Sequence, residues 1–299
     1  MNSIKKYLFA LISIFLLSAC ILEGAHHLQN EKSFDSEPLG IGSYQVSPKD
    51  GMVLMYVPEG TFKMGWNDGK EDEKPEHEVY LDAFWIDQTE VTVGQYHQCV
   101  DAGVCGHPEP AVNPMNDGSA TRQSYYDNEN YYDYPVIFVN WSQAKTYCEW
   151  AGRRLPTEAE WEKAARGTDG RLYPWGNEEP NPSLLNYDGI IGDTTKVGSY
   201  PDGASPYGAL DMAGNVWEWV NDWYDPQYYS KSPKQNPSGP ETGYFFINRG
   251  GSFKKSEHSV RSTYRHWYIP PLLGSQIVAH SYDGFRCAVS ANIDEPFTD

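Results

Sequence analysis

Two stretches in the first half of the chain carry the apolar spacing and the end signals of short helices. The first helix is predicted to start at Thr92, because Gln95 three residues later completes a capping box, and to end near Gly103. The second is predicted to start at the cap Ser142 and to end at Gly152. Both are short enough to need packing against a larger core.

A third helix is predicted with both ends marked in the sequence. Thr157 is a suitable N-cap, and Glu160 stands where its side chain can reach back to the amide of Thr157. Pro156 separates this helix from anything before it, and Gly167 supplies the permissive backbone that ends it.

Strand-like runs are few and short. They occur at residues 52–57, 78–85 and 247–249, while 27 Gly and 21 Pro interrupt the rest of the chain. This pattern predicts one domain over residues 45–291, with long loops and a core of its own. An acidic tail follows at residues 292–299.

Residues 125–134 read Tyr-Tyr-Asp-Asn-Glu-Asn-Tyr-Tyr-Asp-Tyr, a local bias found nowhere else in the chain. One interpretation is an exposed loop. The alternative is a contact surface, because Tyr gives a large amphipathic area at low entropic cost.

The first 19 residues are predicted to be a signal peptide. Lys5 and Lys6 form a positive start, and the apolar run at 7–17 is too short to span a bilayer comfortably. The tetrad Leu-Ser-Ala-Cys at 17–20 resembles a bacterial lipobox, in which Cys20 becomes the lipidated N-terminus. The alternative is an ordinary cleaved signal peptide.

Residues 20–44 are predicted to be the lipidated N-terminus and a flexible tether, since they are polar and lack a period. Several acyl chains on Cys20 would anchor the protein stably to a membrane. Residue 21 is Ile and not Asp, so by resemblance to enterobacterial sorting we expect the cell envelope, and the outer rather than the inner membrane.

The charge balance limits the partners. The whole chain has a net charge of −18, and the first 20 residues contain two Lys and no acids, so the exported chain reaches −20. Nucleic acids and anionic membrane surfaces need clusters of Lys and Arg, and none occurs here. We therefore expect no nucleic-acid partner and an unidentified protein or small-molecule ligand; the acidity is equally explained by solubility.

Five groups of residues stand in one order along the chain. They are Glu-Val-Thr at 90–92, Gly-Arg-Arg-Leu-Pro-Thr-Glu-Ala-Glu-Trp-Glu at 152–162, Pro-Trp-Gly-Asn at 174–177, Gly-Asn-Val-Trp-Glu-Trp at 214–219, and Arg-Gly-Gly-Ser-Phe at 249–253 with Gly-Phe-Arg-Cys-Ala at 284–288. Together they resemble the formylglycine-generating-enzyme, or sulfatase-modifying-factor, family. The resemblance implies an α+β fold, C-type-lectin-like, with little regular secondary structure.

The family's founding activity, oxidation of a sulfatase cysteine to formylglycine with copper and oxygen, uses two cysteines after the Gly-Gly-Ser element. The matching positions here hold Lys255 and, within one residue, Val260, and no cysteine lies between Cys148 and Cys287. Soft thiolates hold Cu(I), and neither Lys nor Val replaces a thiolate. We therefore expect no copper and no formylglycine-generating activity, which favours a role other than that of an enzyme.

Structural calcium sites are also implied by the resemblance. Oxygen ligands in a rigid, Gly-rich turn suit Ca²⁺. The alternative is that Glu218 caps local backbone amides without an ion. The family's ligands map onto Asp211, Gly214, Val216 and Glu218 in one site, and onto Asn186, Tyr187, Asp193 and Thr195 in the other.

Other positions match the region that shapes the family's active cleft. None of the histidines has a metal-binding spacing, so the alternative interpretation is that they are exposed or hydrogen-bonded loop residues. The candidate groove residues are Trp217, Ser252, Lys255, His258, Arg261, Arg265, His266 and His280.

Four cysteines remain after Cys20, and they allow three pairings. Cys99 and Cys105 lie six residues apart across a predicted helix end, so a local bridge is reasonable. The resemblance implies the second bridge, Cys148–Cys287. All four would then be structural.

Three hypotheses for the function follow. The first is a lipid-anchored protein that binds or scaffolds at the cell envelope through residues 254–283 and 125–134, including a variant whose C-terminal segment is diversified for ligand capture. The second is a periplasmic oxidase or tailoring enzyme similar to family members that mature siderophores. The third is a structural part of a surface machine.

Overall fold

The computed structural model describes residues 38–108, 119, 121–122, 124–268 and 280–291. The predicted signal peptide, Cys20, most of the tether and the tail 292–299 lie outside the described residues. Within them, no helix has the length and apolar character needed to cross a membrane.

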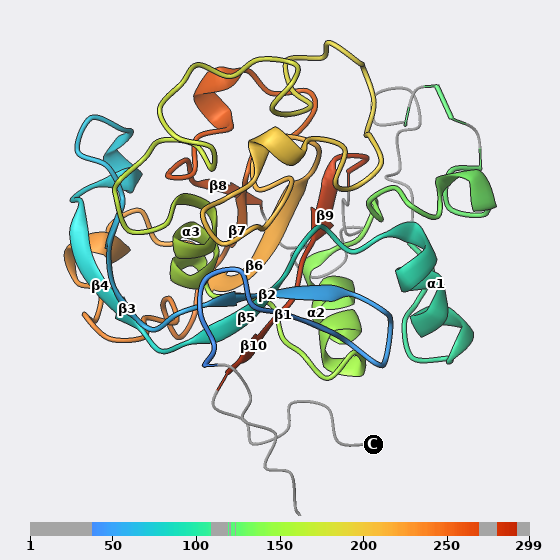
Figure 1. The fold of residues 1–299 in the computed structure, drawn as a ribbon, viewed down its shortest axis with the longest axis horizontal. Coiled ribbons are helices and arrows are strands. Elements are labelled where there is room, and N and C mark those ends of the chain that lie inside the picture. Colours follow the sequence, from blue (N-terminus) through green and yellow to red (C-terminus); the bar gives the residue numbers. More distant parts are fainter. Residues whose placement is uncertain (1–37, 109–118, 120, 123, 269–279, 292–299) are drawn as a thin grey trace, which may run out of the picture. The chain divides into compact units, whose positions relative to one another are not determined.

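Short helices and strands are joined by long loops (Figure 1). The α-helices in the described residues are α1 Val93–Asp101, α2 Trp141–Trp150 and α3 Glu158–Arg166. Single 3₁₀ turns are η1 Glu71–Glu73, η2 Glu129–Tyr131, η3 Pro201–Gly203, η4 Tyr228–Ser230 and η5 Glu257–Ser259. The strands are β1 Tyr44–Val46, β2 Val53–Val57, β3 Gly60–Met64, β4 His77–Leu81, β5 Phe84–Asp87, β6 Trp217–Trp223, β7 Phe246–Arg249, β8 His266–Tyr268, β9 Asp283–Phe285 and β10 Ala288–Ser290.

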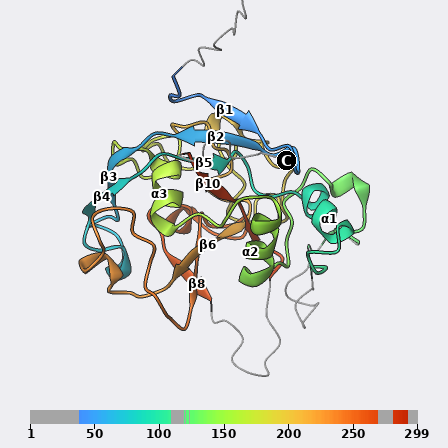
Figure 2. The same cartoon turned by 90° about the horizontal axis from the view of Figure 1, so that it is seen from below.

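The strands form two four-stranded sheets and one hairpin. The first sheet has the order β1-β2-β5-β10 and is antiparallel, and β3 pairs with β4 alone. The second sheet has the order β8-β7-β6-β9, in which only the β6–β9 pair is parallel. Figure 2 shows α2 and α3 on the same side of the first sheet. Few helices, short strands and long loops confirm the predicted α+β class.

Two of the predicted helix starts are confirmed. The side chain of Thr92 accepts a hydrogen bond from the amide of Gln95, and Thr157 accepts one from Glu160, each within a complete capping box. The prediction for the second helix was wrong by two residues, because Asn140 and not Ser142 is its N-cap. The amide of Asn140 is bonded in return by Gln143, so this helix also has a full capping box.

The predicted strand at 78–85 is in fact two strands. β4 pairs with β3, whereas β5 pairs with β2 and β10, so the chain changes sheets between them. The longest strand, β6, was not predicted. Five of its seven residues are buried, but these include Glu218 and Asp222, which hide the apolar signal of a strand.

Both predicted disulfides are confirmed. Cys99–Cys105 closes the end of α1, and Cys148–Cys287 ties α2 to the segment between β9 and β10. All four cysteines lie in one apolar cluster with Tyr96, Tyr147, Trp219 and Phe285. They are therefore part of the core rather than of a reactive site.

Helix α3 is buried at every position, including its charged ones. It contacts the β3–β4 hairpin on one side and β6 and β7 on the other. Lys163 donates to the carbonyl oxygens of Pro58 (2.7 Å) and Gly60 (2.9 Å), and burial lowers its pKa to about 8. Charged side chains thus take the place that apolar ones usually hold in a central helix.

The corrected start of α2 leads to a paired test. Replacing Asn140→Ala removes the cap and is expected to reduce the free energy of unfolding by ~1 kcal/mol, within a range of about 0.5–2 kcal/mol. Ser142→Ala, at the exposed position first predicted as the cap, should change it by less than about 0.5 kcal/mol. Urea unfolding of both variants decides the matter, and a larger loss for Ser142→Ala would contradict the structure.

Candidate functional site

The β8-β7-β6-β9 sheet has two chemically different faces. Residues directly opposite each other in neighbouring strands share a face, and the side chains alternate along each strand. Trp219 pairs with Asn248, and Asn248 pairs with His266, so these three lie on one face. Glu218 pairs with Arg249 on the other face.

The face with Glu218 and Arg249 is joined to α3 by buried ion pairs. Arg249 donates to Glu158 Oε1 (2.9 Å) and Glu162 Oε2 (2.7 Å), both on α3. Glu218 accepts from Trp161 Nε1 (2.8 Å) and from both ends of the Arg286 guanidinium (2.6 and 2.8 Å). The carboxylates of this face are thus paired with arginines and with Trp161.

The opposite face carries a continuous series of rings. Trp217 stacks on His266 (4.7 Å between ring centroids) and lies 6.0 Å from Tyr264. His266 lies 4.7 Å from Tyr268, which lies 4.9 Å from His280, and His280 stacks on Tyr282 at 5.0 Å. We call this set the ring row: Tyr264, Trp217, His266, Tyr268, His280 and Tyr282.

Buried polar atoms beside the ring row lack partners. Trp217 Nε1, Ser252 Oγ, His266 Nδ1 and both side-chain atoms of Asn248 have no hydrogen-bond partner among the described residues. Trp217, Asn248 and Ser252 are completely buried. Nearly all buried polar groups in proteins are hydrogen-bonded to protein or to water, so these atoms are candidates for contact with a further molecule.

The two histidines of the ring row have different surroundings. Burial, followed by the charges of Lys255, Lys70 and His280, lowers the pKa of His266 to about 4, so its ring is neutral at pH 7. His280 Nδ1 lies 2.8 Å from Asp283 Oδ2. His280 is therefore a hydrogen-bonded histidine, which agrees with the alternative given for these residues.

The structure brings together only some of the predicted groove residues. Trp217, His266 and His280 belong to the ring row, and Lys255 acts on His266 through its charge. Ser252 is completely buried and follows β7. His258 lies at the margin, 5.6 Å from Tyr264 between ring centroids.

Two predicted groove arginines are instead structural. Arg265 is buried and donates to both oxygens of Glu158 (2.7 and 2.9 Å). Arg261 donates to Glu73 Oε1 (2.8 Å) and lies 4.7 Å from the ring centroid of Trp66. Val260, near the position of the family's second active-site cysteine, is buried in an apolar cluster with Leu185.

The predicted calcium set that contains Asn186 and Asp193 is only partly free to bind an ion. The carboxylate of Asp193 accepts from the hydroxyls of Ser119 and Thr121 (2.7 Å each) and lies 3.5 Å from Arg122. Thr195 donates its amide to Asn215 Oδ1 (2.9 Å). By contrast, Asn186 Oδ1 is buried and has no hydrogen-bond partner in the described part of the chain.

The predicted calcium set that contains Asp211 and Glu218 lies among buried carboxylates that outnumber the cations facing them. Burial, reinforced by the charges of Asp211 and Glu218, raises the pKa of Glu90, and burial raises that of Asp211 to about 6. Arg286 is the cation that faces these carboxylates. A surplus of buried negative charge is what a divalent cation neutralises.

These residues therefore suit calcium in the type of ligand oxygen and in negative charge, but they are not arranged as a complete coordination site. Asn215 connects the two regions. Its side-chain Nδ2 donates to Oε1 of Glu90 (3.0 Å), beside Asp211, and its backbone amide donates to the carbonyl of Asn186 (2.9 Å). Gly214 packs so closely on the Asn186 carbonyl that a Cβ would lie 2.3 Å from it. In the described residues, no group of three His, Cys, Asp or Glu side chains is arranged to hold a metal.

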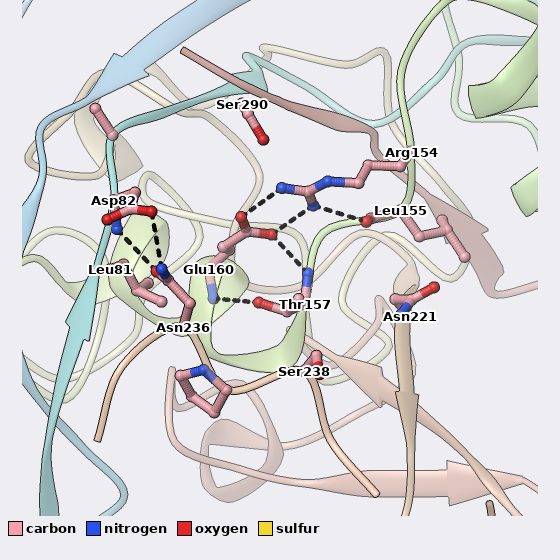
Figure 3. A pocket seen from close by; sticks show the side chains of 12 residues that line it. Leu81, Asp82, Arg154, Leu155, Thr157, Glu160, Asn221, Asn236, Ser238 and Ser290 are labelled. Atoms are coloured by element: carbon pink, nitrogen blue, oxygen red, sulfur yellow. Dashed lines mark hydrogen bonds and ion pairs between the residues drawn. The ribbon is translucent and has the colours of Figure 1, made fainter. Parts of the chain in front are cut away.

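A separate pocket of about 380 Å³ lies beside the start of α3 (Figure 3). Arg154 forms two bonds of 2.6 Å with Glu160 there, and Asn236 donates to Asp82 (2.8 Å). Its charged groups are already paired with each other, so it is a weaker candidate than the ring-row face.

Sequence reasoning missed several residues of this site. Asn248, Tyr264 and Tyr268 were not singled out, although Tyr264, His266 and Tyr268 show the alternation of a strand face. Glu90 was noted only as part of a motif. Its role depends on burial beside Asp211, which no local pattern reveals.

Comparison with known proteins agrees with this fold. Residues 41–291 match the family model described as "Sulfatase-modifying factor enzyme 1-like domain". The chain belongs to this family.

Two relatives and one solved structure illustrate the similarity. The formylglycine-generating enzyme of Streptomyces coelicolor is 34% identical over 300 residues, covering 82% of this chain and 92% of the relative. The serine/threonine-protein kinase pkn1 of Chlamydia pneumoniae is 37% identical over 80% of this chain, which spans only 38% of that relative. The structure of PvdO from Pseudomonas aeruginosa has a TM-score of 0.69 at 26% identity, covering 84% of this chain and 99% of PvdO.

Proposed function

We propose that this protein is a lipid-anchored member of the sulfatase-modifying-factor family that binds a ligand at the cell envelope and does not generate formylglycine. The observation that carries the proposal is the composition of the ring-row face. It combines stacked rings with unpartnered buried donors, while the position of the family's first active-site cysteine holds Lys255. Such a face has the features of a binding site rather than of a thiol-dependent active site.

The cysteines support the same proposal. Four of them are in disulfides, and Cys20 lies in the predicted lipobox. No thiol is left for a Cu(I) site within the domain. The ligand is a protein or small molecule, because the net charge of −18 disfavours nucleic acid.

A second candidate is an oxidase or tailoring enzyme acting on a small molecule. The similarity to PvdO over nearly the whole length of that protein favours it, together with the neutral His266 beside unpartnered groups. No feature of the described residues favours a role as a structural part of a surface machine.

The proposed loss of formylglycine chemistry is tested with a sulfatase-type peptide that contains the substrate cysteine. Incubated with copper and oxygen, the protein is expected to leave the cysteine unchanged by mass spectrometry, while the Streptomyces coelicolor enzyme converts it. A double variant, Lys255→Cys with Val260→Cys, tests whether the fold alone retains the capacity. Conversion by the wild-type protein would refute the proposal.

Lipid anchoring is tested by replacing Cys20→Ser, since the thiol is the proposed acylation site. The wild-type protein should fractionate with membranes and incorporate labelled fatty acid, and the variant should lose the label. Ser33→Ala, in the predicted tether, serves as the matched control, because it leaves both the lipobox and the core disulfides intact. Full labelling of the Cys20→Ser variant would show that the anchor is elsewhere.

We further propose a structural Ca²⁺ near Asn186, Asp211 and Glu90, where unpartnered oxygen and surplus negative charge coincide. An ion that binds only the folded state stabilises it by about 2.7 kcal/mol at a hundredfold excess over Kd. For a domain of this size, chelation should then lower the Tm by roughly 5–10 °C.

The informative variant is Asn186→Ala, which removes an oxygen but no charge. Its Tm is expected to respond less to calcium than that of the wild-type protein. The difference between chelator and calcium is the relevant quantity, because the substitution also breaks the bond from Asn186 Nδ2 to the carbonyl of Asp193. Equal melting of the wild-type protein in both conditions would exclude the ion.

A further inference from the structure

Large apolar side chains are exposed in one short segment at the start of the domain. The exposed fractions are 52% for Leu39, 67% for Ile41, 67% for Tyr44 and 54% for Val46. Five other large apolar side chains in the described part of the chain are exposed, at positions spread from 104 to 267. Single exposed apolar residues are normal, whereas a group of them marks an interaction surface. We call these four residues the β1 patch.

The β1 patch is exposed because β1 is the edge strand of its sheet. The order is β1-β2-β5-β10, and Tyr44 pairs with Met55 while Val46 pairs with Val53. Paired residues share a face of the sheet. Met55 is buried in the apolar core, and Val53 packs against it. The apolar face of the sheet therefore continues past the core and ends on the surface of the protein.

The segment that carries the patch has no charge, in a chain where 21% of the residues are charged. Residues 38–48 contain no Asp, Glu, Lys or Arg, and neither does β2. The next charged residues along the chain are Lys49, whose ammonium lies 4.9 Å from the ring centroid of Trp150, and Asp50, which is buried. Tyr and Trp are enriched where proteins meet the surface of a bilayer, so this composition suits a lipid interface.

The position of the patch in the chain places it near the proposed anchor. Leu39 follows Cys20 by 19 residues. A flexible chain of that length has an r.m.s. end-to-end distance of roughly 25 Å. A domain anchored through Cys20 therefore stays within reach of the bilayer, and its high effective concentration there makes a weak apolar contact sufficient to hold it. This step rests on the proposed lipid anchor.

We propose that the β1 patch docks the domain onto the surface of a zwitterionic bilayer, with Ile41, Tyr44 and Val46 in the interfacial region. The lipid is zwitterionic because the net charge of −18 opposes an anionic surface. A second copy of the chain is a less suitable occupant, since β1 has only three residues and offers few backbone groups for edge-to-edge pairing.

Docking through β1 orients the candidate ligand face. Figure 2 shows β1 on the opposite side of the domain from β8. The ring row, which includes His266 and Tyr268 of β8, is then turned away from the bilayer and towards the aqueous phase. The contact with lipid and the proposed binding of a ligand can therefore occur together.

The test measures vesicle binding without the lipid anchor, on the chain 20–299 with Cys20→Ser, which includes every described residue. Flotation with phosphatidylcholine vesicles is expected to give a partition coefficient on the order of 10³ M⁻¹, below the ~10⁴ M⁻¹ of a single myristoyl chain. Half of the protein should then float at about 1 mM lipid. Added salt or anionic lipid should not strengthen or abolish this binding through charge, because burial of apolar surface supports it.

Two double variants separate the β1 patch from exposed apolar residues in general. Ile41→Ser with Val46→Ser is expected to weaken vesicle binding at least about tenfold, because two side chains lose their burial in lipid. Ile190→Ser with Ile191→Ser is the matched control, since these side chains are 55% and 52% exposed in another loop, and it should change binding less than about twofold. Both variants should unfold at the wild-type urea concentration, because the replaced side chains are exposed.

Less than a tenth of the wild-type protein bound at about 10 mM lipid, or equal losses in the two double variants, would overturn the inference. Binding that requires anionic lipid and disappears in salt would overturn it as well.

Sedimentation equilibrium without lipid is expected to show a monomer. A dimer that dissociates in the variant with Ile41→Ser and Val46→Ser would assign the patch to a second copy and overturn the inference. Fatty-acid labelling at Cys20 is a separate measurement, so failure of the docking surface and failure of the lipid anchor are distinguishable.

Discussion

The structure depends on the buried ion pairs between α3 and the β8-β7-β6-β9 sheet. Glu158 and Glu162 project from a helix with no exposed position, and Arg249 and Arg265 reach them from the sheet side. Burial by itself raises the pKa of Glu158, but the charges of Arg265 and Arg249 outweigh it and hold the pKa below its usual range. The carboxylate is therefore ionised and bound throughout the neutral range.

Buried ion pairs of this kind contribute specificity more than net stability. Desolvation offsets much of the attraction, yet removal of one partner leaves an uncompensated charge that costs about 3–5 kcal/mol. The ion pairs can form in only one arrangement of α3 on the sheet. Glu162 restricts it further, because it also accepts hydrogen bonds from the amide of Gly65 and from Arg166. With one face fixed in this way, the alternation of the strands presents the ring row on the other face.

The distance along the chain between interacting residues explains which features could be predicted from the sequence. The caps Thr92 and Thr157 were found because a capping box spans only four residues, and Asn140 was missed because Ser142 carries the same local signal. The family motifs indicated the fold and the Cys148–Cys287 bridge, whereas spacing alone favoured Cys99–Cys105. The roles of Arg261 and Arg265 were misassigned because their partners, Glu73 and Glu158, lie more than one hundred residues away in the chain.

The candidate site was predictable only in part for the same reason. Trp217 and Ser252 were recognised from motifs, but Lys70 reaches Tyr264 from 194 residues away. Asn248 is significant only because its buried amide lacks a partner, which is a property of packing. Chemistry that depends on a shared environment cannot be read from a local pattern.

The coupling between α3 and the sheet is measured most directly by a double-mutant cycle on Glu162 and Arg249. Glu162→Gln, Arg249→Gln and the double variant are unfolded in urea at pH 7. If the pair fixes the sheet, each single change costs about 3–5 kcal/mol and the double change costs less than their sum, with a coupling of at least about 1.5 kcal/mol. Additive effects within about 0.5 kcal/mol would show that the two residues act independently and would contradict the account.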